Sequence, residues 1–318
     1  MNVLITGSIG FIGFHLSKKL LENDFFVVGV DNQNNYYDVD LKLQRLSILN
    51  KYKLYKHHNI DISNKKDLNK LFDTNHFDII VNLAAQAGVR FSIDHPEEYI
   101  NSNINGFFNV LENVKKTKSK LIYASSSSVY GDAKNFPSSE NDNTDNPVSL
   151  YAASKKCNEV IAKSYSNLYG LQIVGLRFFT VYGPWGRPDM ALFKFTKAIL
   201  NNEPINVHNY GKHSRDFTYI DDITEAIYLL MRYKKFNSLD GIYNIGSGNP
   251  IQLLKFIEEI ENKLQKKAII RFQDKQPGDV LKTFSNTKRL FNTLDFKPNV
   301  SLEKGISEFI DWYVDFYE

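Results

Sequence analysis

Short apolar runs alternate with longer amphipathic segments along the first part of the chain. The runs have the length of strands, and they cover residues Asn2–Thr6, 25–30, 54–58, 77–82, 121–124 and 172–178. The segments 14–22, 99–116 and Leu150–Tyr169 are predicted to be helical. Strands that alternate with helices in this way are typical of α/β proteins with a parallel sheet. We therefore expect a Rossmann-type doubly wound sheet.

A different pattern begins after Thr180. The segment 182–190 is rich in turn-forming residues and interrupts the regular alternation. Beyond it, short strands are predicted near Ile205 and at 215–219, 242–245 and 268–272, with helices between them. We expect a first domain at 1–180, to which some later segments return, and a smaller C-terminal α/β lobe formed mainly by 181–318 and packed over the ligand crevice.

The composition narrows the class of protein. The chain has 318 residues, 42% of them hydrophobic, and a formal charge of +3 with both signs interspersed, so nothing calls for nucleic acid or a membrane as partner. Its one cysteine, Cys157, excludes an intramolecular disulfide and fits a reducing compartment. Met1 leads directly into a strand without a charged signal region, and no apolar run reaches about 18 residues. We expect a cytoplasmic protein without a metal ion.

A glycine-rich turn follows the first strand and opens the first helix. Glycines at 7, 10 and 13 allow a tight turn, the approach of a pyrophosphate to the backbone, and contact between helix and strand. The N–H groups at the start of the helix then face the phosphates. We predict a dinucleotide site, and its first members are Gly7, Gly10, Phe11, Ile12 and Gly13.

The ends of the following strands complete this site. Asp31 and Asn32 follow the second strand, and a carboxylate there suits the ribose hydroxyls of NAD and repels the 2′-phosphate of NADP. Asp61, next to Ile62, can meet the adenine amino group, or it can cap the helix that begins nearby. Small residues after the fourth strand let the backbone lie against the cofactor. This last group comprises Leu83, Ala84, Ala85 and Ala87.

Tyr151 and Lys155 carry the candidate chemistry. Four residues apart in a helix, they share one face. A neighbouring ammonium favours the phenolate, so the pair can act as a general acid/base for a sugar or alcohol hydroxyl. The same spacing is common on solvated helix faces, so it becomes informative only because a predicted dinucleotide site precedes it in the chain. The serine run 125–128 ends a strand, where open α/β sheets bind ligands.

Together these residues resemble the extended short-chain dehydrogenase/reductase family over almost the whole chain, and the run from Arg177 to Pro184 adds to the likeness. In that family a serine lends a hydroxyl, the tyrosine is the acid/base, and the lysine holds the nicotinamide ribose. The resemblance implies a tightly bound NAD that is regenerated in each turnover. The implied catalytic residues are Ser126, Tyr151 and Lys155; Phe178 joins Tyr151 and Lys155 in the cofactor site.

Within the family, the motifs at 88–90, 180–190, 210–222 and 276–279 look like those of nucleotide-sugar 4-epimerases that act on UDP-glucuronate. By this resemblance Arg215 binds the diphosphate, and the segments 190–192 and 206–208 hold the uridine. Arg90 and Arg187 are cations that a desolvated sugar carboxylate would need, although each could instead form a loop salt bridge. The implied substrate-binding residues are Arg90, Ser127, Ser128, Thr180, Arg187, Met190, Ala191, Leu192, Val207, Arg215 and Asp279.

The expected reaction is the conversion of UDP-glucuronate to UDP-galacturonate through a transient 4-keto sugar, for polysaccharide biosynthesis. Dehydratases and decarboxylases of the family usually carry an acid just before the Val-Tyr-Gly step, where Ser128 stands here, so these activities rank lower. Epimerisation of UDP-glucose or of a UDP-N-acetylhexosamine, and a non-catalytic NAD-binding role, remain alternatives. Relatives usually pair through two helices of each subunit, here 99–116 and Leu150–Tyr169, which implies a homodimer.

Overall fold

The structure is a computed structural model that describes residues 1–239, 241–276 and 278–318. Within these ranges a central sheet of seven strands runs parallel throughout. The strand order reverses beside β1, as in a doubly wound sheet, and the predicted Rossmann-type fold is confirmed. Across the sheet the strands are β10 (Gly241–Ile245), β6 (Ile173–Phe178), β5 (Lys120–Ser126), β4 (Ile79–Asn82), β1 (Asn2–Thr6), β2 (Phe26–Asp31) and β3 (Tyr55–Asn59).

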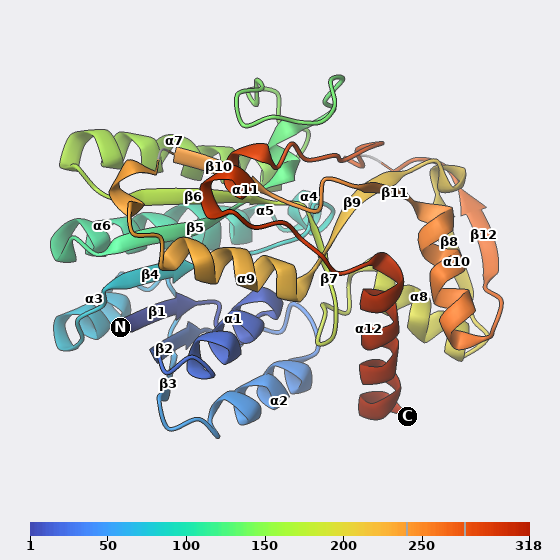
Figure 1. Cartoon of the computed structure of the whole chain (residues 1–318), viewed down its shortest axis with the longest axis horizontal. Helices are drawn as coiled ribbons and strands as arrows, with labels where there is room; N and C mark the ends of the chain where they lie inside the picture. The colour runs from blue at the N-terminus through green and yellow to red at the C-terminus, as the bar shows by residue number, and fades with distance from the viewer. Residues whose placement is uncertain (240, 277) are drawn as a thin grey trace.

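Helices cover both faces of this sheet (Figure 1). Successive residues of β1 point to opposite sides: Val3 and Ile5 belong to the same core as Phe14 of α1, whereas Leu4 belongs to the same core as Phe107 of α6. Burial on both faces explains why most of these strands are continuous apolar runs in the sequence. One layer contains α1 (Phe11–Leu21), α2 (Val39–Leu49), α9 (Ile220–Met231) and α11 (Lys288–Leu294), and the other contains α3 (Lys65–Thr74), α6 (Phe107–Thr117) and α7 (Leu150–Tyr169).

The smaller lobe lies at one end of the sheet (Figure 1). Its core is rich in aromatic side chains; Phe217, for example, stacks on Phe256 with ring centroids 4.1 Å apart. A three-stranded sheet has the order β11 (Pro250–Gln252), β9 (Ser214–Tyr219), β7 (Thr180–Tyr182), and a parallel pair joins β8 (Pro204–His208) to β12 (Ile269–Gln273). The helices of the lobe are α8 (Ala191–Leu200), α10 (Leu253–Leu264) and α12 (Leu302–Tyr317).

Short helical segments make several of the connections near the crevice. A π-helical segment, η1, precedes α6, and a 3₁₀ turn, η2, contains the second half of the serine run. None of the helices in the described part of the chain is both long and apolar enough to cross a membrane. These short segments are α4 (Phe91–Asp94), α5 (Pro96–Glu98), η1 (Tyr99–Gly106), η2 (Ser127–Tyr130), η3 (Asn209–Gly211) and η4 (Phe236–Ser238).

Several elements differ from the sequence-based expectation. α1 begins at Phe11 rather than at residue 14, because Gly10 is its N-cap and the helix starts inside the glycine motif. The first half of the helix predicted at 99–116 is π-helical. The strand predicted at 242–245 pairs with β6 in the main sheet instead of joining the smaller lobe. α2 was not predicted, since buried Lys42 and Arg45 interrupt its apolar face.

Candidate active site

The glycine turn packs tightly between β1 and α1. Gly7 has φ of +70°, and a Cβ there would lie 2.7 Å from the Ala84 nitrogen. A Cβ on Gly13 would lie 2.0 Å from the Gly7 oxygen. Only glycine fits at these two positions, and the start of α1 is thereby held close to the end of β1. The site therefore fits a pyrophosphate bound by the N–H groups of the first turn of α1.

The acids predicted for the adenosine end lie at the ends of neighbouring strands. Asp31 is the last residue of β2, and its Oδ1 accepts a hydrogen bond of 2.9 Å from the Gln33 N–H. The amide of Asn32 donates to Asp61 at 2.8 Å. Burial would raise the pKa of Asp61, but hydrogen bonds from Ser63 and Asn32 outweigh it and lower the pKa. Asp61 is not the helix cap considered earlier, because the side chain of Asn64 caps α3.

The residues after β4 lie against the glycine turn. The Leu83 N–H bonds the Thr6 carbonyl at 3.1 Å, and Ala84 approaches Gly7. The Tyr99 hydroxyl donates to the Ala87 carbonyl at 2.9 Å. These contacts hold the segment that was predicted to flank the cofactor against the glycine turn. Phe178, another predicted cofactor residue, ends β6 and is paired in register with Ser126 of β5. The other residues predicted for this part of the site are Ile12, Ala85 and Ile62.

The predicted catalytic side chains meet at the end of β5 and the start of α7. Ser126 ends β5, and its Oγ accepts a 3.1 Å hydrogen bond from the Ser128 N–H. Tyr151 lies in the first turn of α7, whose N-cap is Ser149. The Lys155 ammonium donates to the Ala124 carbonyl at 2.9 Å and lies 5.9 Å from the centroid of the Tyr151 ring. The three residues that the sequence analysis assigned to catalysis therefore form one cluster in the structure.

Burial controls the charge of this cluster. It raises the pKa of Tyr151, while the Ser126 side chain and the charge of Arg187 act in the opposite direction. Burial also lowers the pKa of Lys155 to about 8. The sequence argument expected an ammonium to lower the phenol pKa. Burial is instead the larger effect, and Arg187 is the cation whose charge acts on the phenol.

Arg187 is held in place by Asp189. Its Nε lies 3.0 Å from one Asp189 oxygen and its Nη2 lies 2.5 Å from the other. The Tyr36 hydroxyl donates to the same carboxylate at 3.2 Å. Burial, with the charge of Asp189, raises the pKa of Tyr36 to about 12. The salt bridge that the sequence left open as an alternative is therefore present, and it leaves Nη1 outside the Asp189 contact.

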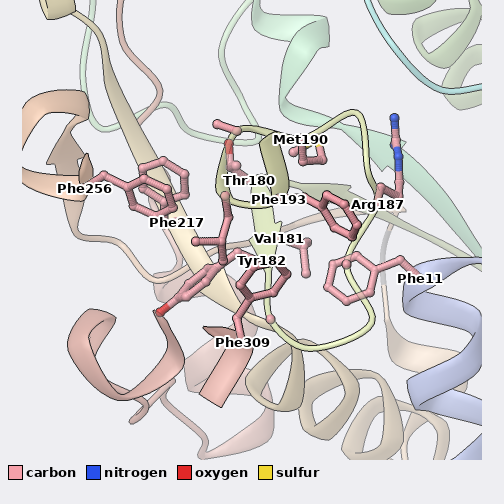
Figure 2. A pocket seen from close by; sticks show the side chains of 14 residues that line it. Phe11, Thr180, Val181, Tyr182, Arg187, Met190, Phe193, Phe217, Phe256 and Phe309 are labelled. Carbon is pink, nitrogen blue, oxygen red and sulfur yellow. The ribbon is translucent and has the colours of Figure 1, made fainter. Parts of the chain in front are cut away.

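A largely apolar pocket lies beside this arginine. Figure 2 shows the Arg187 guanidinium pointing away from the aromatic side chains that line most of the pocket. Thr180 and the predicted uridine residues Met190, Ala191 and Leu192 also line it. Leu192 is buried, as is Val207 on β8, whose backbone is paired with β12. We regard this pocket as part of the lobe core and not as the place of the chemistry.

The other predicted substrate residues form their own contacts. Arg90 makes a 3.0 Å ion pair with Asp279, and about half of the Arg90 side chain is exposed. The Nη1 of Arg215 donates to the Ser214 carbonyl at 3.0 Å. Burial lowers the pKa of Arg215, and Asp279 opposes this shift. Pro277, within the predicted motif 276–279, lies outside the described residues.

Sequence reasoning missed a second pocket, which lies against the serine run. It is lined by Ser127, Ser128, Lys282, Thr283 and others. The sequence reasoning also missed the contact between Tyr36 and Asp189, which are 153 residues apart in the chain. No local pattern marks these residues, because each gains its position only through the packing of distant segments.

Known proteins resemble the chain over both the sheet and the smaller lobe. Residues 3–246 match the model of the NAD dependent epimerase/dehydratase family. The protein CapI of Staphylococcus aureus is 50% identical, with 100% of each chain covered. A probable UDP-glucuronate 4-epimerase of Rhizobium meliloti is 42% identical over 98% of this chain and 97% of its own. The crystal structure of a Bacillus cereus UDP-glucuronic acid 4-epimerase, in complex with UDP-glucuronic acid and NAD, has a TM-score of 0.95 at 34% identity, with 100% of both chains covered.

Proposed function

Because the chain belongs to the NAD dependent epimerase/dehydratase family, we propose that it is a UDP-sugar 4-epimerase that interconverts UDP-glucuronate and UDP-galacturonate. One observation carries the choice of an acidic sugar. Arg187 lies near the Tyr151 phenol, and its charge opposes the rise in the phenol pKa that burial causes. A guanidinium beside the reacting position suits a substrate that brings a carboxylate, because a desolvated carboxylate needs a cationic partner.

The proposed cofactor site combines the glycine turn with the strand ends around it. The first turn of α1 would bind the pyrophosphate, and Asp31 with Asn32 would bind the adenosine ribose. Asp61 and Ile62 would lie near the adenine, and the segment from Leu83 to Ala87 would lie against the cofactor. NAD supplies, when bound, an acceptor that takes a hydride from C4 of the sugar and returns it. We assign this site to residues 1–180 with the returning strand β10, and nucleotide-sugar binding mainly to 181–318.

In the proposed mechanism Tyr151 moves the proton. Its phenolate takes the proton from O4 as C4 is oxidised, and the phenol returns a proton when the ketone is reduced from its other face. Ser126 hydrogen-bonds O4 and holds Tyr151 in place. Lys155 holds the nicotinamide ribose, with its ammonium fixed by the Ala124 carbonyl. No net redox change occurs, so the cofactor does not need to exchange between turnovers.

The proposed substrate contacts divide between firm and loose binding. Arg215 would bind the diphosphate, while the backbone near Met190 and Val207 would bind the uridine. Arg187 would hold the sugar carboxylate, and this contact would restrain the loss of CO₂ from the intermediate. The 4-keto form of glucuronate is a β-keto acid, which loses CO₂ readily. A carboxylate held by a guanidinium retains its charge and loses CO₂ less easily, since bond cleavage must break that ion pair.

Parallel assays with three UDP-sugars test the proposal. Purified protein, without added cofactor, is offered UDP-glucuronate, UDP-glucose or UDP-N-acetylglucosamine, and the products are identified by NMR. We expect UDP-galacturonate from UDP-glucuronate and little turnover of the neutral sugars. A UDP-pentose as the main product, or faster turnover of UDP-glucose, would contradict the proposed substrate. Bound NAD without activity on all three would support a non-catalytic protein instead.

We also propose that two copies of the chain pair in the cytoplasm and that the product serves polysaccharide biosynthesis. Apolar side chains are exposed on the two helical segments expected to pair. Val160 and Leu168 of α7 are 58% and 69% exposed, and Ile100 of η1 and Phe108 of α6 are also exposed. Exposed apolar side chains gathered on such helices are typical of an interface. The single cysteine supports a reducing compartment.

A further inference from the structure

Tyr36 lies in the segment that follows the predicted ribose site, and it reaches the turn that carries Arg187. Its hydroxyl donates to Oδ2 of Asp189 at 3.2 Å, and the same oxygen pairs with Nη2 of Arg187. The central guanidinium carbon of Arg187 also lies 5.8 Å from the centroid of the Tyr36 ring. Tyr36 therefore acts on Arg187 in two ways, through its ring and through the shared carboxylate.

Packing holds the Tyr36 side chain in this position. Its ring meets the ring of Phe91 edge to face, with centroids 4.8 Å apart. A Cβ on Gly88 would lie 2.5 Å from the Tyr36 hydroxyl oxygen, so the glycine of the motif 88–90 makes room for this hydroxyl. Burial and the charge of Asp189 raise the pKa of Tyr36 to about 12. The hydroxyl thus keeps its proton at neutral pH and acts as a donor.

The backbone of the turn is fixed without the Tyr36 hydroxyl. The Nε2 of His15 lies 2.9 Å from the Pro184 carbonyl oxygen, and the fully buried Arg45 donates to the Trp185 carbonyl at 2.6 Å. Removing one hydroxyl leaves both of these contacts in place. We therefore expect a Tyr36→Phe protein to fold, with its effect confined to the charged side chains of the turn.

In the proposed reaction two carboxylates share Arg187, that of Asp189 and that of the sugar. Asp189 contacts Nε and Nη2, and Nη1 lies outside this contact. A hydroxyl that donates to Asp189 fixes the orientation of its carboxylate and takes up part of its negative charge, so that less of the guanidinium charge is neutralised within the protein. We infer that Tyr36 is a positioning residue that acts through Asp189, sets Arg187 to bind the sugar carboxylate, and so favours acidic over neutral sugars. This inference rests on the proposed function and deepens it.

Binding to an inactive enzyme tests the role of Tyr36. In a Tyr151→Phe background, where turnover is blocked, calorimetry measures Kd for UDP-glucuronate and for UDP-glucose, and the ratio of the two values reports recognition of the carboxylate. We expect Tyr36→Phe to lower the preference for UDP-glucuronate about fivefold or more, while Kd for UDP-glucose changes less than about twofold. The matched control Tyr52→Phe, which removes a hydroxyl that donates to Glu22 at 3.1 Å, should leave both Kd values unchanged.

A double-mutant cycle tests the route through Asp189. In an Asp189→Ala background, Tyr36→Phe should cause no further loss of preference, because the contact that it removes no longer exists. A further fivefold loss in that background would overturn the inference. So would a single Tyr36→Phe variant that keeps its preference, or one that binds both sugars more weakly to the same extent.

Arg187→Met separates the inference from the function on which it rests. If the Tyr151→Phe protein binds UDP-glucuronate no better than UDP-glucose, or if Arg187→Met leaves the preference unchanged, the proposed carboxylate contact is wrong and the inference falls with it. If Arg187→Met abolishes the preference and Tyr36→Phe does not change it, the proposed function stands and the inference alone is wrong.

Discussion

Tyr151 and Lys155 share an environment that disfavours charge on both. Burial raises the pKa of the tyrosine and lowers the pKa of the lysine to about 8. Both shifts have the same physical origin, which is the loss of water around an ionised group. Each of the two groups is therefore harder to ionise than it is in water. The phenolate required by the proposed mechanism must gain stabilisation from Ser126, Arg187 and bound ligands.

The burial of Lys155 predicts a pH dependence of stability. The pKa of Lys155 in the folded chain, about 8, lies below the ordinary lysine value of 10.5, so the unfolded chain binds more protons between these pH values. Stability then rises with pH in this window, by about 3 kcal/mol for such a shift. We expect urea unfolding to show that the native protein gains stability relative to Lys155→Met as pH rises from about 8 to 10.5. A difference in stability between the two proteins that stays constant across this window would contradict the pKa shift.

At the scale of elements, the junction of β1 and α1 depends on the absence of side chains. A Cβ on Gly13 would lie 2.0 Å from the Gly7 oxygen, and this clash could be relieved only if the backbone moved. We expect Gly13→Ala to cost about 1–3 kcal/mol and to distort the pyrophosphate site. Chromatography of nucleotide released from denatured protein should show little NAD. Lys18→Ala, on the same helix, should retain it, and a full complement of NAD in Gly13→Ala would refute this prediction.

The pairing of α7 with β6 depends on a buried ion pair. Arg177 and Glu159 meet at 2.8 Å, and Ser125 donates to the same carboxylate. Removing the charge of Glu159 leaves a buried guanidinium without its partner. We expect Glu159→Gln to destabilise the fold by about 3–5 kcal/mol in denaturant unfolding. Lys304→Gln, which removes an exposed pair on α12, should cost less than about 1 kcal/mol, and similar values for both variants would show that burial does not matter here.

Elements and site residues were predictable where their signal is local. The bounds of Asn2–Thr6 and Leu150–Tyr169 agree with the sequence pattern, because an apolar run and a capped helix are encoded by neighbouring residues. The residues at the strand ends are brought together as expected from the fold. The partners Asp189 and Tyr36 escaped prediction, and so did Lys282, which lines the same pocket as Ser128. Each of these pairs joins segments that only the folded chain brings near one another.

At the scale of the whole molecule, the exposed apolar face of α7 predicts the state of association. We expect the double variant Val160→Glu, Leu168→Glu to be monomeric in sedimentation velocity. Each subunit would bring two glutamates to the symmetric interface, and burying four unpaired charges there is unfavourable. Val314→Glu, at a residue of α12 that is 40% exposed, should leave the dimer intact. A native protein that sediments as a monomer, or a double variant that still pairs, would exclude this interface.

The position of β10 has a consequence for synthesis of the chain. β10 pairs with β6 but is translated about sixty residues later, which takes roughly 3 to 12 seconds at a typical ribosomal rate. During that interval the edge of β6 has no neighbour, and an open edge of this kind can recruit a strand from another nascent chain. The helix α9, which is completed just before β10, buries apolar residues against α1 and can hold the growing end near that edge. Ribosome-bound chains that stop short of Gly241 should therefore be the forms that aggregate and engage chaperones.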